Sequence, residues 1–210
     1  MARKLKRIAV ATHRSTPADL GQTEDACPGA RQGTDESQAY PEDGVMLPRV
    51  SPMLAVPATP FDSPEHSFEV KWNGIRALAA VEAAGWRSWG RQRAEYTERY
   101  PELDVLRRLP AGTLVDGELV VFDADGRPDL RRLLRRHGLT AGWKIGLARR
   151  CCPVQCVLFD LLYHRGRCLL REPLARRREV LAETCRRLDV AEVLFSEAVP
   201  ESGARPGWRR

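Results

Sequence analysis

The pattern of apolar and polar residues changes at Met46, and this change determines which part of the sequence can form a folded domain. Residues 1–47 mix Thr, Pro, Gly, Asp, Glu and Gln without a sustained apolar period, as in segments that cannot bury a core. From Met46 to Pro200, short apolar runs alternate with turn residues. The sequence therefore predicts a disordered tail over residues 1–47, one folded domain over residues 48–200 and a disordered end over residues 201–210.

Patterning inside this domain predicts a mixture of strands and helices. Residues 67–72 and 75–82 have the pattern of two strands, and Asn73-Gly74 between them is a favoured two-residue hairpin turn. Apolar spacing, with proline or glycine at the ends, predicts further strands at residues 113–122, 154–162 and 192–196 and helices at residues 101–109, 130–137 and 173–188. Prolines in V-S-P-M-L-A-V-P-A-T-P exclude a helix and predict an extended strap against the domain.

Basic charge is concentrated in the folded part of the chain. Residues 127–187 contain 16 Lys and Arg against 5 Asp and Glu, whereas residues 1–48 contain 6 against 7. Such a surplus favours a polyanionic partner such as nucleic acid, and a solvated helical face would explain it equally well. No apolar run approaches the roughly 20 residues of a bilayer span, and the basic N-terminus lacks the apolar stretch of a signal peptide. We therefore expect a cytoplasmic protein without a membrane partner.

Six cysteines raise the question of a zinc site. They form no C-x-x-C pair, and no histidine stands at finger spacing from them, so the usual structural zinc pattern is missing. In a cytosolic chain we expect them to be reduced thiols, with Cys156 on a buried strand.

The segment F-E-V-K-W-N-G-I-R-A, residues 68–77, contains one of only four lysines among the 34 basic residues. Lys71 stands at the end of a predicted strand. A lysine becomes a nucleophile only where desolvation or neighbouring cations lower its pKa. Arg76 would serve that purpose and would also bind phosphate oxygens. Spacing alone favours an ordinary lysine on a surface hairpin.

This segment resembles the K-x-D-G-x-R signature of the ATP-dependent DNA ligases and related covalent nucleotidyltransferases. Lys71 stands at the position of the lysine that becomes adenylylated. Three more family motifs follow in order: G-R-Q-R-A-E-Y-T-E-R-Y-P-E-L at residues 90–103, V-D-G-E-L-V-V-F-D at residues 115–123 and V-L-F-D-L-L-Y-H-R-G at residues 157–166. The resemblance covers residues 51–196 and is similar in wording to the bacterial repair ligases associated with end joining.

The resemblance implies an α+β fold, namely the two-sheet antiparallel, ATP-grasp-like adenylation domain with helices outside. It implies that Lys71 attacks the α-phosphorus of ATP and carries AMP, with ATP and Mg²⁺ as cofactors. Phe159 would stack on adenine, and Glu118 would accept from a ribose hydroxyl or hold Mg²⁺. The remaining nucleotide-binding residues would be Glu69, Arg76 and Arg91. The implied partner is nicked or broken duplex DNA, which makes the protein nucleoid-associated.

The sequence departs from the family in two places. Asn73 replaces the aspartate of the first motif and removes a negative charge beside the nucleophile. No lysine follows Lys144, so the family's later E-G-x-V-x-K and K-x-K motifs are absent, and we expect an adenylation domain that is incomplete at its C-terminus.

Three functional interpretations follow from these matches and departures. The first is a ligase that seals DNA breaks through lysyl-AMP, working with a C-terminal ligase fragment or with repair proteins. The second is an inactive ligase remnant that binds DNA or a protein partner through its basic helices. The third is another nucleotidyltransferase of the superfamily, such as an RNA ligase.

Overall fold

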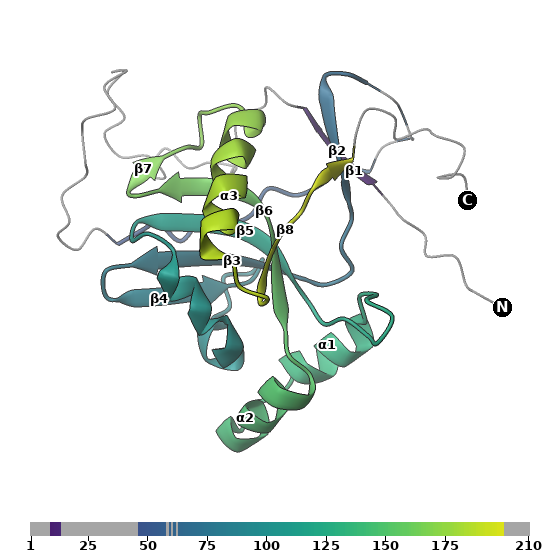
Figure 1. The fold of residues 1–210 in the computed structure, drawn as a ribbon, viewed down its shortest axis with the longest axis vertical. Coiled ribbons are helices and arrows are strands. Elements are labelled where there is room, and N and C mark those ends of the chain that lie inside the picture. The colour runs from purple at the N-terminus through teal and green to yellow at the C-terminus, as the bar shows by residue number, and fades with distance from the viewer. Residues whose placement is uncertain (1–8, 14–45, 58, 60, 62, 200–210) are drawn as a thin grey trace.

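The computed structural model describes residues 9–13, 46–57, 59, 61 and 63–199 (Figure 1). Within the segment interpreted as a tail, Ala9–His13 form strand β1, which the polar texture of residues 1–47 did not predict. The rest of that segment up to residue 45, and the predicted end at residues 201–210, lie outside the described residues.

The strands form two sheets, as the α+β interpretation predicts (Figure 1). In the smaller sheet, β2 (His66–Val70) lies between β1 and β9 (Ala198–Val199). The larger sheet has the order β4 (Gly85–Trp89), β3 (Ile75–Glu82), β5 (Thr113–Val120), β6 (Gln155–His164) and β7 (Arg167–Cys168). Strand β8 (Val193–Phe195) also pairs with β6, and this pair is parallel whereas the others are antiparallel.

The predicted helices occur at their expected places. They are the 3₁₀ helix η3 (Pro101–Arg108), α1 (Leu130–His137) and α3 (Leu174–Leu188). Two helices were not predicted, the short η2 (Thr97–Arg99) and α2 (Gly142–Cys151). None of the helices in the described part of the chain has the length and apolar character of a membrane span.

The predicted hairpin around Asn73-Gly74 is wrong. Strand β2 pairs with β1 and β9, while β3 is already flanked by β4 and β5. The chain therefore crosses from the smaller sheet to the larger one at this point. A Cβ atom on Gly74 would lie 2.1 Å from the carbonyl oxygen of Leu119, so glycine is needed here for close backbone approach and not for a hairpin turn.

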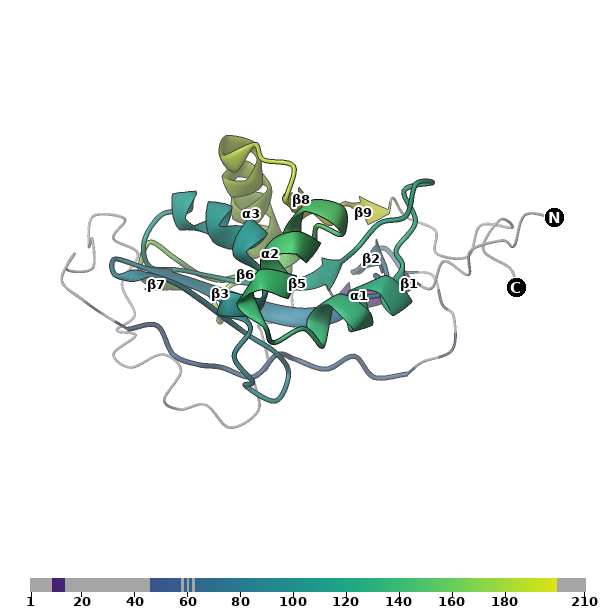
Figure 2. The ribbon, with the colours of Figure 1, turned by 90° about the horizontal axis from the view of Figure 1, so that it is seen from below.

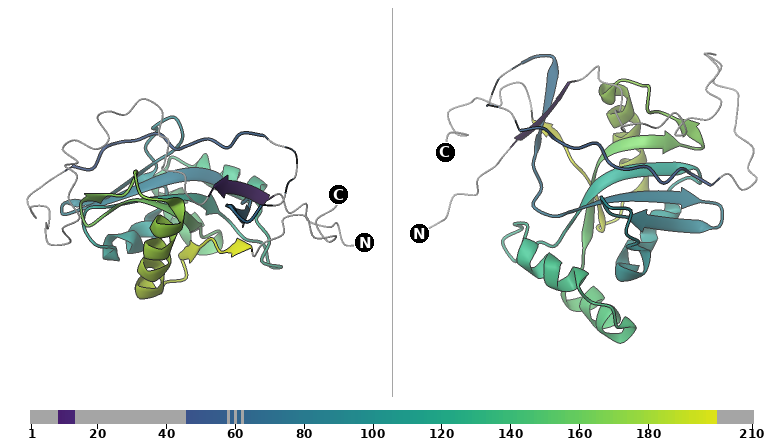
Figure 3. Two further views of the ribbon diagram at one scale, coloured as in Figure 1. Left: turned by 90° about the horizontal axis from the view of Figure 1, so that it is seen from above. Right: turned by 180° about the vertical axis from the view of Figure 1, so that it is seen from behind.

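The larger sheet carries an apolar core on each face. On β3, Ala77, Ala79 and Val81 belong to the core under η3 and α3, whereas Leu78 and Ala80 pack with Leu47 and Val50 of the N-terminal strap. Figure 2 shows the helices on one side of the sheet and the strap on the other, and the right view of Figure 3 shows the strap crossing the strands. The indole Nε1 of Trp89 donates to the carbonyl of Val50 over 2.9 Å. The strap prediction is confirmed at Val50, and Leu47, which was predicted to lie in the disordered tail, is buried against the sheet as well.

Candidate active site

The predicted site residues come from neighbouring strands near the junction of the two sheets. Glu69 lies on β2, and Lys71 follows the end of that strand. Arg76 on β3 stands directly across the ladder from Glu118 on β5. Both have the strand parity that projects from the strap side of the sheet. On β6, the register against β5 jumps from Leu158 to Asp160, so Phe159 occupies a β-bulge, which re-aims a side chain.

Arg76 links these strands. Its guanidinium makes a two-point ion pair with Asp116, with Nε–Oδ1 2.6 Å and Nη2–Oδ2 2.7 Å. The same group lies over the ring of Phe159, 4.4 Å from its centroid, a cation–π arrangement. Arg76 therefore links Phe159 and Asp116. Its Nε and Nη2 groups, which were expected to bind phosphate, donate instead to the carboxylate of Asp116.

Glu118 is a half-buried carboxylate next to the nucleophile candidate. It accepts a hydrogen bond from the backbone N–H of Gly74, and burial raises its pKa to about 7 against the opposing effects of Arg76 and Lys71. Among the described residues, no ion pair neutralises it. Such a carboxylate is suited to accept a hydrogen bond from a hydroxyl group or to bind a cation.

Glu118 should make stability pH-dependent in a defined direction. Because its pKa is 4.5 when exposed and about 7 when folded, the folded state holds the extra proton and stability falls as pH rises between these values. We expect the unfolding free energy of the wild type to fall relative to Glu118→Gln between about pH 5 and about pH 8. Urea unfolding of both proteins measures this difference, and parallel pH profiles would contradict the assignment.

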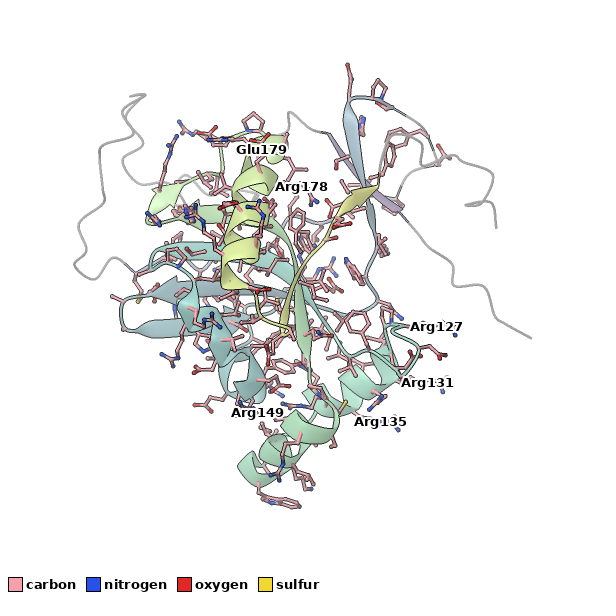
Figure 4. All side chains as sticks on the ribbon, viewed as in Figure 1. Arg127, Arg131, Arg135, Arg149, Arg178 and Glu179 are labelled. Atoms are coloured by element: carbon pink, nitrogen blue, oxygen red, sulfur yellow. The ribbon has the colours of Figure 1, made fainter. Side chains whose placement is uncertain are left out.

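Glu69 is engaged by Arg178 of helix α3, a residue that was not singled out from the sequence. The two form an ion pair at 2.8 Å, and burial raises the pKa of Glu69 against the lowering effect of Arg178. Arg178 also donates to the carbonyl oxygens of Phe159, over 3.0 Å, and Ser196, over 2.5 Å, and Figure 4 shows it on the side of α3 that faces these strands. The sequence signal that could have identified Arg178 is the run of three arginines at residues 176–178, just after the proline that begins the helix.

Lys71 lies at the open side of this cluster. Its side chain is exposed, yet it is close enough to lower the pKa of Glu118. The neighbouring Trp72 is fixed by a hydrogen bond from its Nε1 to the Ser196 hydroxyl, 3.0 Å away. Asn73, at the position of the family's aspartate, is also exposed. A nucleotide could therefore reach the amine from solvent.

Arg91 lies further out, in the turn after β4. Its side chain is exposed, and no hydrogen bond or ion pair joins it to another part of the described chain. Leu78 pairs with Trp89 at the end of the β3–β4 ladder. The ladder ends there, because the chain turns and the N–H of Gly90 donates to the carbonyl of Ala94, so the structure does not bring Arg91 into contact with the cluster.

Metal ligands are sparse at this site. Within residues that the structure describes, no three His, Cys, Asp or Glu side chains gather as a metal site, and the carboxylates of Asp116 and Asp160 are bonded to Arg76 and Arg177. Glu118 is the carboxylate free to bind a cation. One such ligand suits Mg²⁺, which usually completes its shell with substrate phosphates and water.

The cysteines lie elsewhere and differ in state. Cys156 is buried on β6 as expected, and Cys151, Cys152 and Cys185 are also free thiols. Cys168 is disulfide-bonded, so the expectation of reduced thiols is wrong for this residue.

A cavity of about 460 Å³ lies away from the candidate site, between α3 and residues 108–110 and 164–165. Its lining contains none of the predicted site residues, and it is formed by Arg108, Leu109, Pro110, His164, Arg165, Arg176, Glu179, Val180, Glu183, Thr184, Arg187 and Leu188. The side chains able to carry out chemistry gather near the exposed Lys71, and we take this cluster as the candidate active site.

Residues 52–200 match the family described as ATP dependent DNA ligase domain. The multifunctional non-homologous end joining protein LigD of Mycobacterium bovis is 31% identical over 160 residues, which are 74% of this chain and 19% of that protein. Two solved structures are similar at 28% identity over 66% of this chain and 42% of theirs. They are the ligase domain of M. tuberculosis LigD, with a TM-score of 0.54, and mycobacterial DNA ligase D complexed with ATP and MES, with a TM-score of 0.51. The chain spans less than half the length of each of these proteins.

Proposed function

The chain belongs to the ATP-dependent DNA ligase family, and on that premise we propose that its adenylation domain forms lysyl-AMP on Lys71 for sealing breaks in duplex DNA. The observation that carries the proposal is that Lys71 lies close enough to Glu118 to lower its pKa, and that Glu118 stands across the ladder from Arg76, which lies over the ring of Phe159. The similarity to LigD proteins supports a role in end-joining repair.

The proposed step is a displacement at phosphorus. The neutral amine of Lys71 forms an N–P bond to the α-phosphorus of ATP, the bond to the β-phosphate oxygen breaks, and pyrophosphate leaves. The amine loses its proton to solvent, to which it is exposed. The adenylate then awaits a 5′-phosphate of DNA, the class of acceptor that the family's name implies.

The other site residues fit the nucleotide in distinct ways. Phe159 offers an aromatic ring for adenine, with its opposite face backed by Arg76. Glu118 would accept from a ribose hydroxyl or hold Mg²⁺, which supplies positive charge to the phosphates when bound. Glu69 acts through its ion pair with Arg178, which positions the end of β2 and therefore Lys71. Arg91 would meet the ribose or phosphates from the edge.

Incubation of the full chain with Mg²⁺ and ATP labelled at the α-phosphate tests the proposal. We expect a covalent label that survives denaturation, no label from γ-labelled ATP, and discharge of the label on adding nicked duplex with a 5′-phosphate. Discharge by nicked RNA alone would assign the chain to RNA ligation instead.

The second candidate is an inactive ligase remnant that binds DNA or protein. Two observations favour it: Asn73 removes the family's negative charge beside Lys71, and Asp116 takes up the fork of Arg76. Salt-sensitive DNA binding without any α-label would establish this alternative and overturn the first.

A further inference from the structure

The α1–α2 region carries an unusual charge distribution. Residues 130–151 contain seven Lys and Arg and no Asp or Glu. One of the seven, Arg136, is buried against Glu102. The exposed members are Arg131, Arg135, Lys144, Arg149 and Arg150. An unneutralised cationic surface of this kind has a polyanion as its natural partner.

Three arginines on this surface form a row. Arg131 and Arg135 are four residues apart on α1, which places them on one side of the helix at a rise of about 6 Å, and Arg127 lies in the turn before the helix. Figure 4 shows the three side chains projecting from the same outer side of α1 and the turn before it. Arg127 has one exposed contact, with Asp125 at 3.4 Å. Arg131 and Arg135 have no ion pair within the described chain.

The row is joined firmly to the active site. Helix α1 is capped by Asp129, whose side chain accepts from the backbone N–H of Arg132 and whose own backbone N–H donates to Val121 just after β5. The ring of Phe122 meets the ring of Trp72 edge-on at 6.1 Å. Because Trp72 follows Lys71, the row begins in the neighbourhood of the nucleophile.

We propose that Arg127, Arg131 and Arg135 hold the phosphate backbone of the duplex that flanks a break presented to Lys71. The inference rests on the proposed function and assigns the DNA-binding surface within this domain. Guanidinium groups bind phosphate oxygens at two points, and a duplex carries one negative charge per about 1.7 Å of its axis, so its backbone attracts a row of exposed arginines.

Binding of nicked duplex DNA to the full chain, followed by fluorescence anisotropy over a series of salt concentrations, tests this surface. The variant replaces Arg127, Arg131 and Arg135 by Gln. Each lost phosphate contact should reduce the magnitude of the negative slope of log K against log salt by about 0.9, so we expect the slope to become less negative by about 2 to 3.

The matched control replaces Arg176, Arg186 and Arg187 on α3 by Gln. It removes the same charge from an equally exposed surface, but these arginines are paired with Glu179 or Glu183. Its salt slope should stay within about 1 of the wild type. Thermal unfolding of both variants identifies any change that reflects loss of structure.

Equal salt slopes for the two variants, or no binding by the wild type, would overturn the inference. Equal slopes would show that the row makes no phosphate contacts with the duplex. Lysyl-AMP formation needs no DNA, so it should be unchanged in the row variant. Absence of the α-label from the wild type would instead contradict the proposed function and leave the DNA result standing.

Discussion

Lys71→Ala is expected to abolish covalent labelling by α-labelled ATP, a fall of at least about a thousandfold. The reason is chemical: the variant lacks the amine that forms the N–P bond, and arginine cannot supply a neutral nitrogen nucleophile near neutral pH. Lys71→Arg should therefore be as inactive as Lys71→Ala. Labelling followed by denaturing electrophoresis measures the loss.

Lys144→Ala is the matched control for this result. Lys144 is an exposed lysine on α2, outside the candidate site, and the chain's remaining lysines are Lys4 and Lys6. Labelling should persist in Lys144→Ala. Because Lys71 is itself exposed, its variants should unfold at nearly the wild-type temperature. Persistent label in Lys71→Ala, or its loss in Lys144→Ala, would refute the assignment of the nucleophile.

Arg177→Met should produce the largest loss of stability, about 3 to 5 kcal/mol. Arg177 is 1% exposed and makes a two-point ion pair with Asp160, at 2.8 and 2.9 Å. Its Nη1 also donates to the carbonyl of Glu172. Removing the guanidinium leaves the Asp160 carboxylate buried without its partner, which costs more than the pair itself contributes. Urea unfolding at neutral pH measures the change.

The matched control is the same substitution at the adjacent Arg176, which lies on the surface. Arg176 is 62% exposed and pairs with the equally exposed Glu179, so Arg176→Met should change stability by less than about 1 kcal/mol. Similar losses for the two variants would show that Arg177 is not the buried support that its contacts indicate.

The sequence was sufficient to predict elements whose signals are local. Helix α1 begins and ends at the predicted residues because Asp129 caps it and Gly138 follows it, and α3 follows Pro173 as expected. Helix α2 was missed because Gly142 and Gly146 lower its helix propensity and because Trp143 and Leu147 are exposed, which blurs the apolar stripe. A helix is predicted from sequence by its apolar stripe, so a helix without a clear stripe is missed.

Strand pairing and the support of the site depend on contacts between distant residues. Glycine serves a hairpin turn and a close backbone approach equally well, so Asn73-Gly74 could not reveal that the chain changes sheets there. The resemblance to ligases selected Lys71, Glu118 and Phe159; the structure places Lys71 near Glu118 and links Glu118 to Phe159 through Arg76. The pairing of Glu69 with Arg178 joins positions 109 residues apart, and no local pattern encodes it.

Arg178 reaches β2, β6 and the segment after β8 from a single side chain. Substitution of Arg178 would therefore remove one polar contact from each of these three segments at once. Amide hydrogens of β2 and β6 should thus exchange with solvent in concert when the start of α3 frays. Arg178 therefore couples α3 to the strands that carry Glu69 and Phe159.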